Sequence, residues 1–165
     1  MKLLPDPLGK EFDRLPRTVR ILSEDDLLII DVVPAVLAAP RPVDTSNPVW
    51  RALEGASEVR QANRFLRIAY ELVIGVVVVD EGRPHPARWH DEVYALYRKE
   101  PSIGPLFIVS DSPWHAEVQD WQGGDDPGLK HYCIASECNL IDILAVRRDS
   151  WWLPNDRSSI DQWRG

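Results

Sequence analysis

In its central part the chain reads Asn63-Arg-Phe-Leu-Arg-Ile-Ala-Tyr-Glu-Leu-Val-Ile-Gly-Val-Val-Val-Val-Asp80, and this stretch decides the fold. It carries the strongest β-strand signal in the sequence, because β-branched and aromatic residues dominate it. The stretch is longer than a typical strand. We therefore expect a bend or a β-bulge near Glu71 or at Gly75 to divide it.

A second strand pair is expected at residues 130–146, where two alternating segments flank a short polar turn. Tyr132, Ile134, Ile141 and Ile143 recur in these segments with the period of two that one face of a strand requires. The stretch therefore predicts a half-buried hairpin.

The remaining elements follow one another without a regular alternation of strands and helices. Strands are expected at residues 17–22, 27–33 and 106–109. Short helices are expected at residues 47–54 and about 112–121, the second of them capped by Asp111 or Ser112 with Pro113 at its first position. Residues 88–99 fit a helix, and a strand fits them nearly as well. The pattern predicts an α+β domain with a mostly antiparallel, meander-like sheet that is covered by two or three short helices.

The chain of 165 residues fits a single domain. Residues 1–16 hold three prolines and are expected to form an amino-terminal arm over the surface. Residues 149–165 form a tail with Trp151, Trp152 and Trp163. Three Trp side chains are too much apolar surface to leave in water, so we expect this tail to pack back on the domain.

The composition excludes several classes of protein. The formal net charge of −7 argues against a nucleic-acid-binding protein, because such proteins neutralise phosphates with Lys and Arg. The longest apolar run, Leu72–Val79, is too short to cross a bilayer, so no membrane contact is expected. The amino-terminal segment lacks the apolar core of a signal peptide. Two cysteines without a C-x-x-C motif fit a reducing compartment, and we expect a cytoplasmic protein.

Side chains able to do chemistry crowd together in the hairpin at residues 130–146. His131 and Cys133 point to the same face of the first strand, Cys138 lies in or near the turn, and Asp142 lies across it. These four residues are the alternative set for a metal site or a Cys/His nucleophile. The favoured interpretation is structural: His131 bonds the backbone or Asp142, and the cysteines pack as small apolar residues. We therefore expect no cofactor, no metal and no catalytic residue.

An aspartate interrupts the apolar strand at residues 27–33. Asp31 stands between Ile30 and Val32, and two placements are open to it. Either it lies on the solvent-exposed face, which we favour, or it is a buried acid that needs a partner such as Arg20.

Two acidic turns are the candidate partner-binding residues. An acidic turn that also carries an exposed aromatic residue is suited to recognising a basic protein. The candidates are Glu24, Asp25 and Asp26 in one turn, and Trp121, Asp125 and Asp126 in and beside the other.

The order and spacing of several stretches resemble a group of small uncharacterised bacterial proteins. The resemblance covers roughly residues 47–146, whereas the first 46 residues and the Trp-rich tail lie outside it. It implies an immunity protein of a toxin system. The stretches that carry it are Trp50–Ala56, Tyr70–Glu81, Gly104–Glu117, Pro127–Ile134 and Ile141–Ala145.

Two functional hypotheses result. The first is a non-enzymatic immunity protein that neutralises a cognate bacterial toxin with a basic surface by direct contact. Small size, acidity, seven Trp residues and the lack of a P-loop, a dinucleotide-binding motif or a nucleophile elbow favour it. A homodimer is the other protein partner considered. The second hypothesis is a small metal-dependent or Cys/His enzyme that uses the hairpin cluster.

Overall fold

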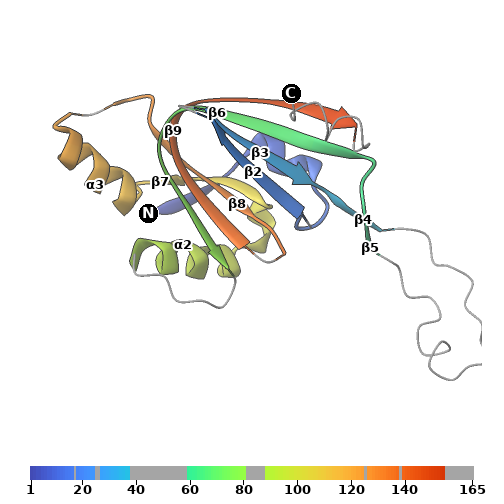
Figure 1. Cartoon of the computed structure of the whole chain (residues 1–165). Coiled ribbons are helices and arrows are strands. Elements are labelled where there is room, and N and C mark those ends of the chain that lie inside the picture. Colours follow the sequence, from blue (N-terminus) through green and yellow to red (C-terminus); the bar gives the residue numbers. More distant parts are fainter. Residues whose placement is uncertain are drawn as a thin grey trace, which may run out of the picture.

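The structure is a computed structural model that describes residues 1–16, 18–24, 27–37, 59–80, 88–124, 126–137 and 139–154. Seven strands form one antiparallel sheet in the order β1-β7-β8-β9-β6-β3-β2, and two α-helices accompany it (Figure 1). The prediction of an α+β domain with a meander-like antiparallel sheet is confirmed. The strands of this sheet are β1 (Lys2–Pro5), β2 (Thr18–Glu24), β3 (Leu27–Val33), β6 (Arg64–Asp80), β7 (Leu106–Ser110), β8 (Lys130–Ala135) and β9 (Asn139–Pro154).

Four helical segments and a second, small sheet complete the described residues. The α-helices are α2 (Arg88–Lys99) and α3 (Pro113–Gln122), and the 3₁₀ helices are η1 (Pro7–Glu11) and η2 (Pro101–Ile103). Strands β4 (Ala35–Leu37) and β5 (Val59–Gln61) pair separately from the main sheet. None of the described helices has the length and apolar character that crossing a membrane requires.

Strands β6 and β9 are the two longest strands of the sheet, and they pair with each other. They pair from Arg64 opposite Pro154 to Asp80 opposite Asn139, and both bend strongly along their length (Figure 1). The register shifts between Val73 and Gly75, so the expected bulge lies in this region and the strand continues through it. A β-bulge increases the local twist and bend of a strand. Strand β6 can therefore continue as one strand along the whole sheet.

The two faces of the sheet carry separate cores, because successive strand residues point to opposite sides. One core cluster includes Ile30, Ile68, Ile141 and Ile143. The second includes Phe107, Cys133, Leu140 and, from α2, Val93. The predicted hairpin thus has both of its faces buried.

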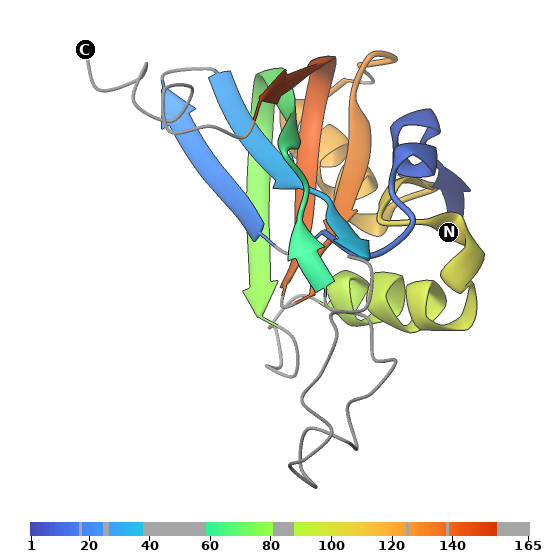
Figure 2. The same ribbon diagram turned by 90° about the vertical axis from the view of Figure 1, so that its right-hand side faces the viewer.

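The helices gather at one end of the sheet. Figure 2 shows α2 and α3 beside the part of the sheet formed by β7 and β8, away from β2 and β3. Helix α2 buries Trp89, His90 and Val93. Helix α3 lies against β8, yet none of its ten residues is buried. Residues 88–99, for which the sequence left a helix and a strand open, form helix α2, so the strand interpretation is wrong.

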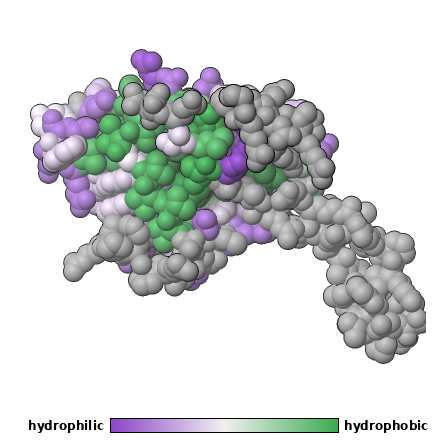
Figure 3. Space-filling model, in the orientation of Figure 1, coloured by the Kyte–Doolittle hydropathy of each residue, from purple (hydrophilic) through white to green (hydrophobic). Residues whose placement is uncertain are grey.

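The second half of β6 presents apolar side chains to solvent. Strand β3 pairs with β6 only from Leu66 to Glu71, so among the described strands the later half of β6 pairs with β9 alone. Leu72, Ile74 and Val78 are 41–50% exposed. Figure 3 shows a continuous hydrophobic area over this part of the strand.

The start of the expected carboxy-terminal tail belongs to the sheet. Residues 149–154 continue β9, because the first half of β6 supplies hydrogen-bonding partners for them. The Trp152 ring is half-buried with its centroid 5.9 Å from that of Phe12, and Trp151 is 40% exposed. The predicted end of the last strand near residue 146 was thus too early.

The amino-terminal segment also contributes a strand, which the sequence did not predict. Lys2–Pro5 forms β1 at the edge of the sheet, paired with β7, and η1 follows it. Two expectations lie outside the described residues, namely the helix at residues 47–54 and the part of the tail at residues 155–165 that holds Trp163.

Candidate functional site

The pairing of β8 with β9 brings three chemically active side chains together. Cys133 lies directly opposite Asp142, and His131 lies two residues before Cys133 on the same face. All three are at most 1% exposed. This grouping is the one expected from the alternation of the hairpin. Cys138, the fourth member of the alternative metal set, lies outside the described residues.

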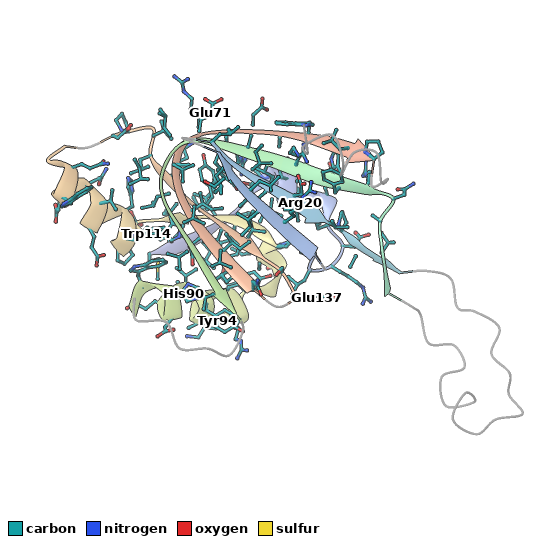
Figure 4. The ribbon with its side chains drawn as sticks, in the orientation of Figure 1. Arg20, Glu71, His90, Tyr94, Trp114 and Glu137 are labelled. Atoms are coloured by element: carbon teal, nitrogen blue, oxygen red, sulfur yellow. The ribbon has the colours of Figure 1, made fainter. Side chains whose placement is uncertain are left out.

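Two further side chains reach this group from outside the hairpin. His90 on α2 places its Nδ1 2.6 Å from Asp142 Oδ2, and Ser112 at the start of α3 places its Oγ 2.7 Å from His131 Nδ1. Both residues are buried. Figure 4 shows His90 and, on α3, the neighbouring Trp114 next to strands β6 and β9. We call Ser112, His131, Cys133, Asp142 and His90 the buried network.

One assignment of the protons satisfies all of these contacts. Ser112 Oγ accepts the backbone N–H of His115 at 3.2 Å, which leaves its hydroxyl hydrogen to be donated to His131 Nδ1. His131 then donates through Nε2 to Asp142 Oδ1 at 2.9 Å. Cys133 Sγ donates to the same oxygen at 2.8 Å. The carboxylate of Asp142 thus accepts hydrogen bonds from His131, His90 and Cys133.

The surroundings set the ionisation of the two acidic groups. Burial is the largest influence on Asp142 and would raise its pKa, but the hydrogen bonds from His131, His90 and Cys133 together bring that pKa below its ordinary value. Burial raises the pKa of the Cys133 thiol well above its ordinary value, and the negative charge of Asp142 raises it further. Asp142 is therefore the anion of the network and Cys133 is a protonated thiol.

Two indole rings close the network from the side of the helices. Trp89 of α2 and Trp114 of α3 stack with centroids 4.6 Å apart, and both meet the ring of His131 edge to face at 5.5 and 5.3 Å. Beneath them, a Cβ atom at Gly75 would lie 2.7 Å from Trp114 Cζ2. Glycine at this position of β6 therefore lets the second indole approach the sheet.

The geometry limits what the network can do chemically. Ser112, His131 and Asp142 stand in the order of a hydrolase triad, but Ser112 is 3% exposed and its oxygen caps α3. A protonated, fully buried Cys133 is a poor nucleophile. Within the described residues, both the serine and the cysteine are enclosed. A metal ion is different, since one ligand atom each from His131, Cys133 and Asp142 lies within 4.8 Å of the other two.

Asp31 belongs to a second buried polar cluster, so its expected place on the solvent-exposed face is wrong. It is 3% exposed and lies in register between Arg20 of β2 and Arg67 of β6. Arg20 Nη2 lies 2.5 Å from Asp31 Oδ2, and Arg67 Nε lies 2.7 Å from Asp31 Oδ1. Two guanidinium groups compensate the buried charge. Arg20 is the partner that we expected for Asp31 in the alternative of a buried acid.

The candidate partner-binding residues lie at the surface where the structure describes them. Trp121 on α3 is 84% exposed, and Asp126 in the following loop is exposed. Glu24 ends β2, but its side chain is not described. Asp25, Asp26 and Asp125 lie outside the described residues.

A groove of about 580 Å³ lies between the amino-terminal segment and the end of α2. Phe12, Tyr97 and Ile103 contribute apolar walls, and Arg14 and Arg98 contribute positive charge at its rim. The groove shares no residue with the buried network. Its lining also includes Lys10, Asp13 and Ser102.

Sequence reasoning missed His90 and Ser112 as members of the network. A signal for Ser112 existed, because β7 and β8 pair with Val109 opposite His131, and Ser112 follows shortly after the end of β7. Ser112 was expected only as a helix cap, with Asp111 as the alternative, and it fills that role as well. His90 had no comparable signal, since its position depends on how α2 packs against the sheet.

The chain was compared with protein-family models, with curated proteins and with solved structures. None of the three comparisons gave a match.

Proposed function

We propose that this protein is a non-enzymatic binding protein that uses the outer face of α3 to contact a protein with a basic surface. The observation that carries the proposal is Trp121, which is 84% exposed on a helix without a buried residue. An indole in water gains nothing for the fold, whereas Trp is the residue type most enriched among the residues that dominate binding energy.

The charges around Trp121 support a basic partner. Glu117, Asp120 and Trp121 are spaced three and four residues apart on α3, so they share one face of the helix, and all three are exposed. Helix α3 contains no Lys or Arg, and exposed Asp126 follows it. An acidic patch around an aromatic anchor speeds association with a basic surface and fixes its orientation.

The interior of the protein supports binding over catalysis. The side chains best suited to chemistry lie in the buried network, where they bond one another. The most concrete partner is a bacterial toxin that the protein neutralises as an immunity protein. The net charge of −7 fits a basic toxin, such as a nuclease, whose active site the acidic surface would occlude.

The test is co-expression of the full chain with the product of each adjacent gene, followed by measurement of complex formation and of protection from toxicity. For a complex found in this way, Trp121→Ala should weaken binding by about 2 kcal/mol or more, a factor of about 30. The double variant Glu117→Gln/Asp120→Asn should slow association and flatten its dependence on salt. Asp91→Asn/Glu92→Gln on α2 makes the same charge change elsewhere and should leave both unchanged.

Two outcomes would count against the proposal. If no adjacent gene product bound the chain or was neutralised by it, the assignment as an immunity protein would be abandoned. If a complex formed but Trp121→Ala bound as tightly as the wild type, α3 would not be the contact surface. The exposed apolar residues Leu72, Ile74 and Val78 of β6 would then be the next surface to substitute.

A further inference from the structure

The buried network contains a convergent set of metal-ligand atoms that the proposed binding function does not use. The residues that supply these ligand atoms come from two adjacent strands, β8 and β9. The register of the two strands is fixed by a sheet with cores on both faces. Ligand atoms on rigid strands are held more accurately than ligand atoms on loops. The three atoms concerned are His131 Nε2, Cys133 Sγ and one carboxylate oxygen of Asp142.

We propose that these three residues supply three of the four ligands of one Zn²⁺ ion, with a water molecule as the fourth. A thiolate, an imidazole and a carboxylate are all common zinc ligands, whereas Mg²⁺ and Ca²⁺ prefer oxygen ligands alone. The set therefore selects a first-row transition metal, and zinc is the redox-inert choice.

The distances fit a site that opens slightly when it is filled. Zinc bond lengths combined with tetrahedral angles require about 3.5 Å between sulfur and nitrogen and about 3.4 Å between nitrogen and oxygen. The Cys133 Sγ–His131 Nε2 distance is 3.5 Å, which already meets this requirement. The distances from Asp142 Oδ1 are 2.9 Å to Nε2 and 2.8 Å to Sγ, as expected for hydrogen bonds. Withdrawal of that one oxygen by about 0.5–0.8 Å makes room for the ion.

Charge neutrality favours the ion in so closed a place. Without metal, the network buries the negative charge of Asp142. With Zn²⁺ bound, the carboxylate and the Cys133 thiolate together balance the two positive charges, and the site is neutral. A neutral site costs less to bury than an isolated ion.

The proton balance of the step is simple. The zinc–sulfur bond replaces the S–H bond of Cys133, and the released proton goes to solvent. His131 stays neutral but moves its proton from Nε2 to Nδ1, so that Nε2 can bind the ion. Nδ1–H then donates to Ser112 Oγ, which lies 2.7 Å away.

The surrounding residues match the outer shell of a metal site. In such sites the second nitrogen of a ligating His usually bonds a polar partner, and ligating carboxylates are themselves held by hydrogen bonds. Ser112 holds the far nitrogen of His131, and His90 Nδ1 holds the far oxygen of Asp142 at 2.6 Å. The stacked rings of Trp89 and Trp114 limit the access of water.

The first measurement is the metal content of the full chain, purified from zinc-supplemented medium without chelator and analysed by mass spectrometry of the elements. We expect about one zinc ion per chain. Chain unfolded in chelator, dialysed and refolded with Co²⁺ should show the absorption band of a cobalt–thiolate bond. Refolding lets the ion enter a site that is closed in the folded protein.

Variants show which residues hold the ion. Cys133→Ser keeps a hydrogen-bond donor to Asp142 and should lose both the zinc and the thiolate band, with circular dichroism confirming the fold. His115→Gln removes an imidazole of α3 outside the ligand set and should retain both. His90→Gln should weaken metal binding about 10–100-fold, as loss of an outer-shell partner does.

The proposal is overturned if wild-type chain contains no stoichiometric zinc and, after refolding, shows no cobalt–thiolate band. It is also overturned if folded Cys133→Ser retains the metal with wild-type affinity. Neither result would bear on the proposed contact surface of α3, which rests on Trp121 and is tested through the partner.

Discussion

Asp142→Asn tests whether the buried network is held together by a charge. The substitution preserves the size and shape of the side chain and removes only the negative charge. In the wild type, the carboxylate accepts hydrogen bonds from His131, His90 and Cys133. In the variant, the amide oxygen still accepts hydrogen bonds on one side of the site, but the amide NH₂ group faces a hydrogen-bond donor on the other side.

The magnitude follows from these three bonds. A hydrogen bond to a charged group contributes about 1.5–3 kcal/mol and a neutral one about 0.5–1.5 kcal/mol, so three bonds lose about 3 kcal/mol together. The variant no longer buries a charged carboxylate, and this gain in free energy offsets part of the lost hydrogen-bond energy. Because the hydrogen bonds lower the pKa of Asp142 in spite of burial, the offset is smaller than the loss. We expect Asp142→Asn to lower the free energy of unfolding by about 2–3 kcal/mol at pH 7.

The pH dependence has a definite sign. Since the pKa of Asp142 is lower in the folded protein than its ordinary value of 3.8, the stabilisation is fully present well above pH 3.8. It is lost as the pH falls from there through the folded pKa. The asparagine variant has no such group. The difference between wild type and variant should therefore shrink over this acidic range.

The assay is urea denaturation followed by Trp fluorescence, at neutral pH and at several acidic values, with chelator present to exclude metal. Asp149→Asn on the same strand is the control, because Asp149 is exposed, and it should change stability by less than about 0.5 kcal/mol. A variant at Asp142 that matched the wild type at pH 7, or a difference that stayed constant with falling pH, would refute the reasoning.

Three other predictions concern packing, charge and the last strand, and each is checked by the free energy of unfolding in urea. Gly75→Ala should cost about 1–3 kcal/mol because its Cβ would press on the Trp114 ring, whereas Gly124→Ala, which meets nothing within 4 Å, should be close to neutral. Asp31→Asn should cost about 3–5 kcal/mol, since it removes the buried carboxylate that bonds both Arg20 and Arg67, and a loss under 1 kcal/mol would mean that solvent already screens the cluster. Truncation after Arg148 should lower monomer stability by about 3–5 kcal/mol or more through loss of the Trp152 contacts, and an unchanged monomer would show that this half of β9 adds nothing to the fold.

The parts of the structure that follow from local periodicity were predictable from the sequence. Alternation alone placed His131 and Cys133 on one face of a strand and Asp142 across from them, because a residue pair in a tight hairpin has few registers to choose from. The cap of α3 at Ser112 was likewise predictable, since Pro113 follows it at the first helical position.

The parts that depend on long-range packing were not predictable in this way. His90 joins Asp142 only because α2 returns to the face of the sheet that carries Asp142, and no local pattern encodes that return. Asp31 was expected on the solvent-exposed face, although Arg20 was named as its partner in the alternative of a buried acid. Arg67, 36 residues away, supplies half of its compensation, and that pairing appears only once β6 is known to lie beside β3.

The buried network and the exposed face of α3 are connected through the first turn of that helix. A ten-residue helix is marginal in water by itself, so its tertiary anchors decide whether it forms. Those anchors are Ser112, which caps the helix and bonds His131, and Trp114, which stacks on Trp89. Trp121 lies about two turns further on and is exposed. On the proposed function, the buried network would act on binding by holding this helix in place, and we expect a loosened network to weaken partner binding without a direct contact to the partner.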